Sequence, residues 1–328
     1  MLSSESGTVV RRTSIGGQAV LEGLMMMGPD KSVLAVRKPD DTITLEPMPS
    51  GQSKALLSGV PFFRGSVRLF HQMIIGVKAL LRSADLQEEA EEVPADDGSP
   101  ESAQPAGTEK SGKGGASNVS IYLSVVIGIL LGVGLFMLLP NLITLLIVRF
   151  TALEDMKGFG ATVLKNLIEG VFRIALFIGY VALTSMQKDI RRVWMYHGAE
   201  HKTIACYESG LPLTVENIRL FSTRHPRCGT AFLFVVMLVS ILMFAFAGWH
   251  SGIVNLLVRL ALVPVVAGVA FEIIRWSGRH DNLISRWIAK PGLAMQRLTT
   301  KEPDDDMLEV AILAMQAVVP DTPDKDEW

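Results

Sequence analysis

The chain has 328 residues, of which 20% are charged and 49% hydrophobic, and its formal net charge at pH 7 is -2. A mean hydropathy of +0.34 in a chain with this many charges indicates membrane spans separated by polar segments rather than one soluble core. The near-neutral balance gives no reason to expect nucleic-acid binding, and two cysteines are too few for a disulfide framework.

Composition divides the chain into six segments. They are a polar and amphipathic cytosolic N-terminal region (1–84), an acidic linker (85–118), two membrane spans (119–187), a polar insert (188–229), two further spans (230–276) and a cytosolic tail (277–328). The linker is rich in Pro, Gly and Ser and lacks aromatic residues, so we expect it to be disordered. The first residues contain no apolar stretch, and we therefore expect no cleavable signal peptide.

Two patterns stand out in the N-terminal region. Residues 32–37 and 42–46 alternate between apolar and polar and flank a short polar loop, which predicts a β-hairpin. Residues 61–83 place basic side chains on one helical face and apolar side chains on a neighbouring one, which predicts a basic amphipathic helix. Such a helix suits the anionic headgroup layer of a membrane, and packing on its own domain with a solvated basic face is the equal alternative.

Four apolar runs are long enough to cross a bilayer, which takes roughly 20 residues. We place the spans at 119–139, 164–186, 231–249 and 253–276, and expect a kink where the first continues past Pro140 to Phe150. The fold class is therefore mainly α, a polytopic membrane protein with four transmembrane helices and a small α+β cytosolic region. Basic residues gather after the second and fourth spans, so both termini and the 188–229 insert are expected in the cytosol, with reduced cysteines.

A metal-site motif lies in the polar insert. On a helix over 188–208, His197 and His201 stack one turn apart with Glu200 beside them. Two imidazoles can hold Zn²⁺ while the carboxylate takes a proton from water, and the order His-x-x-Glu-His is the inverse of a common metalloprotease helix motif. Two histidines making ordinary hydrogen bonds at the membrane surface are the alternative.

A third ligand must come from elsewhere, because Glu208 lies too far along the same helix. The chain returns to the membrane surface at 224–230, which makes Cys228 the favoured ligand and His225 the second choice. Glu272, near the cytosolic end of the fourth span, is a further option. Arg227 is expected to be a positive-inside anchor rather than a group that stabilises developing charge.

The chain resembles the YqhQ-like family of bacterial membrane proteins, which are uncharacterised and described as predicted metal-dependent enzymes. The resemblance is carried by IGGQAVLEGLMM (15–26), GVPFFRG (59–65), YHGAEHK (196–202), PRCGT (226–230) and PGLAMQRLTT (291–300). It implies an inner-membrane location but no substrate. Gln18 and Glu22 of the first motif are expected either to join the site or to form a structural turn.

The leading hypothesis is a metal-dependent hydrolase at the cytosolic membrane surface. In it, His197 and His201 bind a divalent metal, expected to be zinc, Cys228 or His225 completes the set, and Glu200 is the general base. Its partners are the bilayer and anionic lipid headgroups. The rival hypothesis is a non-enzymatic membrane scaffold or regulator in which any metal is structural.

Overall fold

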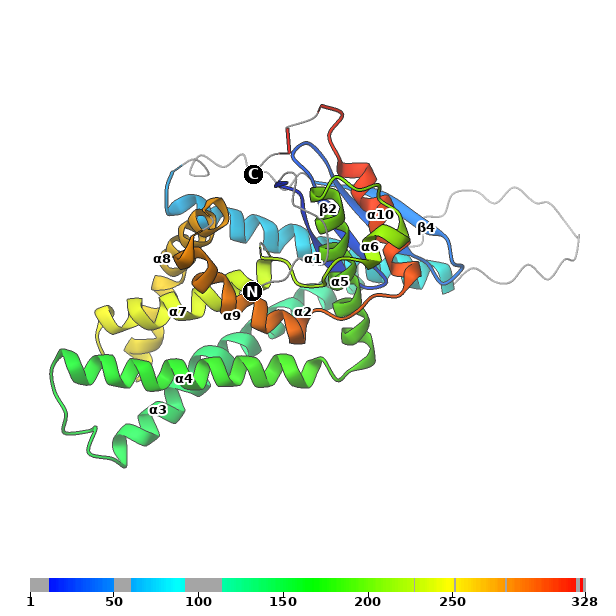
Figure 1. Cartoon of the computed structure of the whole chain (residues 1–328). Coiled ribbons are helices and arrows are strands. Elements are labelled where there is room, and N and C mark those ends of the chain that lie inside the picture. Colours follow the sequence, from blue (N-terminus) through cyan, green and yellow to red (C-terminus); the bar gives the residue numbers. More distant parts are fainter. Residues whose placement is uncertain are drawn as a thin grey trace, which may run out of the picture.

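The computed structural model describes residues 12–49, 60–91, 114–226, 228–250, 252–280, 282–322 and 325–326. Near the N-terminus, β1 (Gly16–Val20), β2 (Gly23–Met27), β3 (Ser32–Arg37) and β4 (Ile43–Met48) form an antiparallel sheet in sequence order. Three helices cover this sheet: α1 (Phe63–Glu91) on one face, and α5 (Lys188–Glu208) with α10 (Asp305–Val318) on the other (Figure 1).

Successive side chains of a strand point to opposite faces of the sheet, so the strands contribute to an apolar core on each face. Leu24 and Met26 of β2 pack with α5 and α10, whereas Met25, between them, packs with α1. The predicted hairpin is confirmed as β3 and β4. The preceding glycine-rich motif is two strands rather than a turn alone, joined at Glu22, whose φ of 47° is left-handed.

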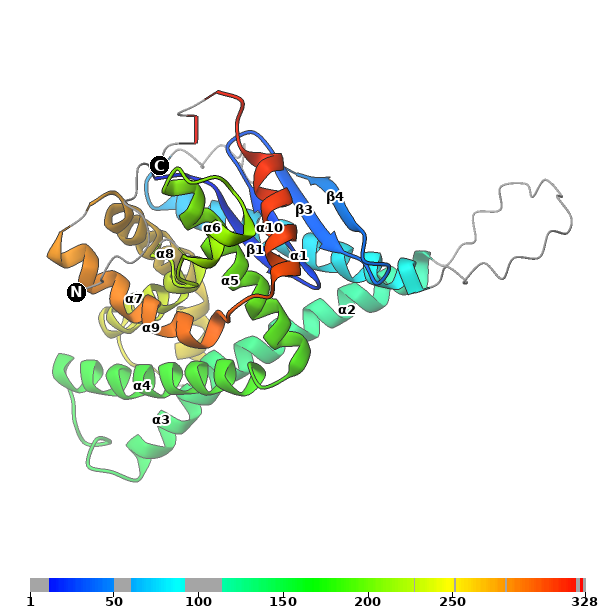
Figure 2. The same ribbon diagram turned by 45° about the vertical axis from the view of Figure 1, so that its right-hand side comes forward.

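Most of the remaining chain is helical. The elements are α2 (Gly114–Val133), the π-helical η2 (Gly134–Leu138), α3 (Leu139–Arg149), α4 (Phe159–Thr184), α6 (Val215–Arg219), α7 (Gly229–Ala247), α8 (Gly252–Arg279) and α9 (Leu283–Thr299). Among the described residues, three stretches are long and apolar enough to cross a membrane: Val126–Arg149, Phe159–Thr184 and Gly252–Arg279. The apolar stretch Phe232–Ala247 in α7 is shorter. α4 lies alongside α3 and α7, and α8 alongside α7 and α9 (Figure 2).

The first apolar helix is distorted next to the proline, as expected. The prediction was a span at 119–139 that continues past Pro140 as a kinked or tilted helix. The helical run continues through α2, η2 and α3 to Arg149, and the distortion is the π turn η2, just before the proline. The ring of Pro140 clashes with the carbonyl four residues earlier and leaves it without an N–H donor. That carbonyl belongs to Phe136, and it accepts a hydrogen bond from Arg173 Nε of α4 at 3.1 Å.

The amphipathic helix is confirmed as α1, and it packs on its own protein. Arg64 forms an ion pair with Glu272 of α8 at 2.5 Å, and Arg82 pairs with Glu46 of β4 at 2.8 Å. The outward side of α1 nonetheless exposes large apolar side chains, including Phe63 and Phe70. α1 therefore docks on the protein and also leaves an apolar face outside.

The linker prediction falls mainly outside the described residues, since 92–113 are not described, while 85–91 continue α1 and 114–118 begin α2. The tail beyond 303 forms α10, whose buried apolar residues follow one another at helical spacing as a stripe. Leu308 and Met315 of that stripe are fully buried against α5 and the sheet. The tail is thus an integral layer of the N-terminal domain.

Candidate metal centre

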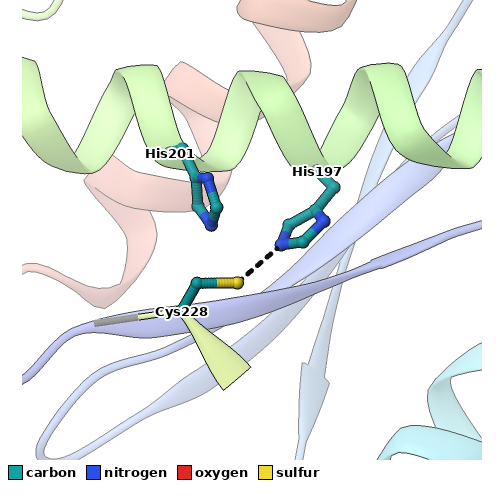
Figure 3. A group of neighbouring side chains, drawn as sticks. All are labelled: His197, His201 and Cys228. Atoms are coloured by element: carbon teal, nitrogen blue, oxygen red, sulfur yellow. Dashed lines mark hydrogen bonds between the residues drawn. The ribbon is translucent and has the colours of Figure 1, made fainter. Parts of the chain in front are cut away.

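Three donors come together at the inner face of α5. His197 and His201 of α5 and Cys228, just before α7, offer ligand atoms that all lie within 4.8 Å of one another. His197 Nε2 is 3.2 Å from Cys228 Sγ, and the ring centroids of the two histidines are 4.4 Å apart (Figure 3). The side chains are buried, with 8%, 1% and 8% exposure for His197, His201 and Cys228.

Main-chain carbonyls orient both imidazoles. His197 Nδ1 lies 2.7 Å from the carbonyl of Thr299, and His201 Nδ1 lies 2.6 Å from that of Thr223. A ring nitrogen facing a carbonyl must carry the proton, so Nε2 of each ring keeps its lone pair for a ligand. This is the outer-shell arrangement typical of metal-binding histidines.

The donor set could bind a metal ion. The Nε2 of His201 is buried, and its nearest ligand-type neighbours are the Cys228 thiol and the His197 ring. Burial lowers the pKa of His201, an effect that the nearby Cys228 opposes, so the neutral form required of a ligand is favoured. Two imidazoles and one thiolate are ligands that suit Zn²⁺.

Glu200 lies on the same helix but faces the sheet. Its Oε1 accepts a hydrogen bond from the main-chain N–H of Gly17 in β1 at 2.8 Å, and its buried Oε2 has no partner among the described residues. Burial raises the pKa of Glu200, while His197 and the Gly17 N–H act in the opposite direction. A carboxyl group of raised pKa beside a metal-ligand set is suited to proton transfer.

Other candidates are occupied elsewhere. His225 Nε2 lies 3.4 Å from Oε2 of the buried Glu208, and its ring centroid is 5.8 Å from that of His201. Glu272 is paired with Arg64, and Glu22 forms a bidentate pair with Arg192 at 2.5 Å. Gln18, the other candidate from the N-terminal motif, lies against Gly76 of α1. Arg227 lies outside the described residues.

Three groups of the site escaped the sequence analysis, namely the N–H of Gly17 and the carbonyls of Thr299 and Thr223. All three are main-chain groups, so no side-chain pattern signals them. The nearest signal is Gly17 itself, because a Cβ there would lie 3.1 Å from Cδ of Glu200.

Comparison with known proteins identifies the family. Residues 60–321 match the family described as "Protein of unknown function (DUF1385)". The chain belongs to this family. It is also 34% identical over 301 residues, covering 90% of this chain and 89% of the other, to the "Uncharacterized protein YqhQ" of Bacillus subtilis (strain 168). No solved structure matches the chain. The resemblance to YqhQ-like proteins is thereby confirmed, and the descriptions of the family and of this relative name no activity.

Proposed function

We propose that this protein is a membrane-embedded, metal-dependent hydrolase whose centre faces the cytosolic surface of the inner membrane. The observation that carries the proposal is the convergence of His197, His201 and Cys228 from two distant parts of the chain. The carbonyls behind both imidazoles support it, since they select the tautomer that a metal needs.

The roles follow from the donor types. His197, His201 and Cys228 would hold Zn²⁺, and three protein ligands leave room for a fourth, which is the pattern of catalytic zinc sites. When bound, such an ion acts as a Lewis acid and lowers the pKa of water. Glu200 would receive the proton of the attacking water at Oε2, while the Gly17 N–H holds Oε1 in place.

We further propose four spans with both termini in the cytosol, α7 being the additional one. α7 packs against α4 and α8, which are long enough to cross a membrane. It also exposes large apolar side chains, such as Leu242 (63%) and Phe246 (77%), which suits contact with lipid tails. The basic residues that follow α4 and α8 support a cytosolic position for those helix ends.

One observation favours a second candidate, a membrane scaffold or regulator with a structural metal. The three donors and Glu200 are all buried, as they are in closed structural sites. In that case His225 is the residue best placed to approach as a fourth ligand, because it neighbours His201.

Metal analysis of the purified protein tests the proposal. We expect stoichiometric zinc in the wild type and its loss in His197→Ala, His201→Ala and Cys228→Ala, whereas His225→Ala retains it. His280→Ala is the matched control, because His280 is exposed and far along the chain from the cluster. Equal and negligible zinc in the wild type and all variants would end the metal hypothesis.

A further inference from the structure

A groove opens between α7, α8 and α9. Its volume is about 630 Å³, within the range of ligand pockets, roughly 300–1,000 Å³. The lining is almost wholly apolar and includes Val235 and Leu238 of α7, Trp276 of α8, and Ile284, Trp287 and Pro291 of α9, with Glu272 as its one acidic member. Two tryptophans beside aliphatic side chains are typical of the level where lipid tails meet headgroups.

The groove is connected to the metal centre through two helices. α7 begins directly after Cys228 and reaches the groove at Val235, an axial rise of about 10 Å at 1.5 Å per residue. α9 runs from Pro291 in the groove to Thr299, whose carbonyl orients His197, a rise of about 12 Å. The groove therefore begins about 10–12 Å along these helices from Cys228 and from the carbonyl that orients His197.

Arginines surround the acidic residue of the groove. Glu272 is neutralised by Arg64, and Arg275 lies within electrostatic range of Arg64, Arg68 and Arg279. Arg64 and Arg275 act on the Glu272 carboxylate, and Arg68 and Arg279 lie around Arg275, so four guanidinium groups gather near one carboxylate. This excess of positive charge beside an apolar groove is complementary to an anionic headgroup attached to a hydrocarbon tail.

We propose that the groove binds an acyl chain of an anionic phospholipid from the cytosolic leaflet, with the phosphate at the arginines of α1 and α8. Lys290, whose Nζ lies 4.0 Å from the centroid of the Trp287 ring, adds a further cation at the groove wall. The site is separate from the metal donors and uses none of them.

A second step, which rests on the proposed function, makes lipids of this class the substrate. In the reaction, the oxygen of water bonds to the acyl carbon or the phosphorus, the ester bond to the glycerol oxygen breaks, and that oxygen receives the proton taken up by Glu200. The proximity of Val235 to Cys228 along α7 is what directs this choice of substrate.

Tryptophan quenching by brominated lipids tests the binding site, since Trp276 and Trp287 line it. The full chain is reconstituted in phosphatidylcholine vesicles that contain a minor fraction of brominated phosphatidylglycerol or, for comparison, brominated phosphatidylcholine. Leu238→Phe with Ile284→Phe fills the groove from two exposed positions, and Leu130→Phe with Leu131→Phe on α2 is the matched control. The double variant Arg275→Gln with Arg279→Gln removes two positive charges from the proposed phosphate site. The double variant Lys188→Gln with Arg191→Gln removes two positive charges from α5 and is the control.

We expect stronger quenching by the anionic lipid in the wild type and in both controls. The preference for the anionic lipid should vanish in Leu238→Phe with Ile284→Phe, which fills the groove. It should fall about tenfold in Arg275→Gln with Arg279→Gln. Equal quenching by the two lipids in the wild type, or an unchanged preference in both test variants, overturns the lipid site.

The substrate step has its own readout, the release of fatty acid, lysolipid or free headgroup from phosphatidylglycerol by zinc-loaded protein. Products that disappear in His197→Ala, while quenching persists, support it. Lipid is overturned as the substrate if the zinc-loaded protein hydrolyses a soluble ester, such as p-nitrophenyl acetate, but releases no product from phosphatidylglycerol. If the wild type contains no zinc, the proposed function is overturned instead. The quenching experiment alone then tests whether the groove binds lipid.

Discussion

Gly198 of α5 lies so close to Lys301 that a Cβ at Gly198 would stand 2.0 Å from the Lys301 carbonyl oxygen. The contact is part of a tight junction, because Lys301 N donates to the carbonyl of Trp194 at 2.9 Å. Two residues earlier, Thr299 presents its carbonyl to His197. The glycine inside the His-x-x-Glu-His motif therefore lets the segment after α9 reach and orient a metal ligand.

Gly198→Ala should damage the centre more than it damages the rest of the protein. The added methyl group must push residues 299–301 away, so we expect lower zinc content and a loss of stability of about 2 kcal/mol or more. Gly179→Ala in α4 is the control, since a Cβ there meets nothing within 4 Å and alanine favours a helix by roughly 0.5–1 kcal/mol. Equal zinc content and melting temperature in Gly198→Ala and the wild type would contradict this account.

Glu200→Gln separates the two candidate functions. The amide keeps an oxygen that accepts from Gly17 N–H, and it is nearly the same size, so folding and zinc binding should persist. If Glu200 is the general base, the rate at which the zinc-loaded protein hydrolyses p-nitrophenyl acetate or phosphatidylglycerol should fall by about 100-fold or more. Hydrolysis and zinc content are measured on the same preparation, and undiminished turnover in Glu200→Gln would assign the residue to the scaffold alone.

The sequence was sufficient for features that depend on side-chain periodicity. His197 and His201 share a face because they are four residues apart on a helix, and Cys228 follows because the chain must return to the same surface before α7. The hairpin of β3 and β4 was likewise readable from alternation.

Features that depend on distant main-chain contacts could not be read from the sequence. β1 and β2 carry glycine and methionine, which have weak strand preferences, and only their burial between α1 and the layer of α5 and α10 makes them strands. Gly23 illustrates this, since a Cβ there would lie 2.1 Å from the carbonyl of Ala35 in β3. The π turn before Pro140 is similar, because its freed carbonyl is matched by Arg173 from another helix.

Glu169 should be the most sensitive residue among the apolar helices. Its two oxygens each lie 2.6 Å from an arginine, Arg173 on α4 and Arg259 on α8, and all three side chains are buried. Glu169→Gln would leave two buried cations without an anion, at a cost of about 3–5 kcal/mol. We expect a clearly lower melting temperature in detergent, and partial recovery when Arg259→Gln is added.

The exposed Glu154→Gln, in the loop between α3 and α4, serves as the control for loss of a carboxylate and should melt like the wild type. If Glu169→Gln also melts like the wild type, the two arginines do not depend on this carboxylate. Failure of Arg259→Gln to restore any stability would point to lost packing rather than unpaired charge.

Cys206 should make the folded state sensitive to alkali. Burial raises the pKa of its thiol from 9.0 to about 11, and the S–H points toward the carbonyl of Pro212 at 3.6 Å. Above pH 9 the unfolded chain gains a thiolate that the folded chain does not, so the stabilising contribution is complete below pH 9 and is lost as the pH rises toward 11. Denaturation midpoints across this range, with chelator present, should fall less steeply for Cys206→Ala than for Cys228→Ala. Parallel curves for the two variants would show that the Cys206 thiol ionises at the same pH in both states.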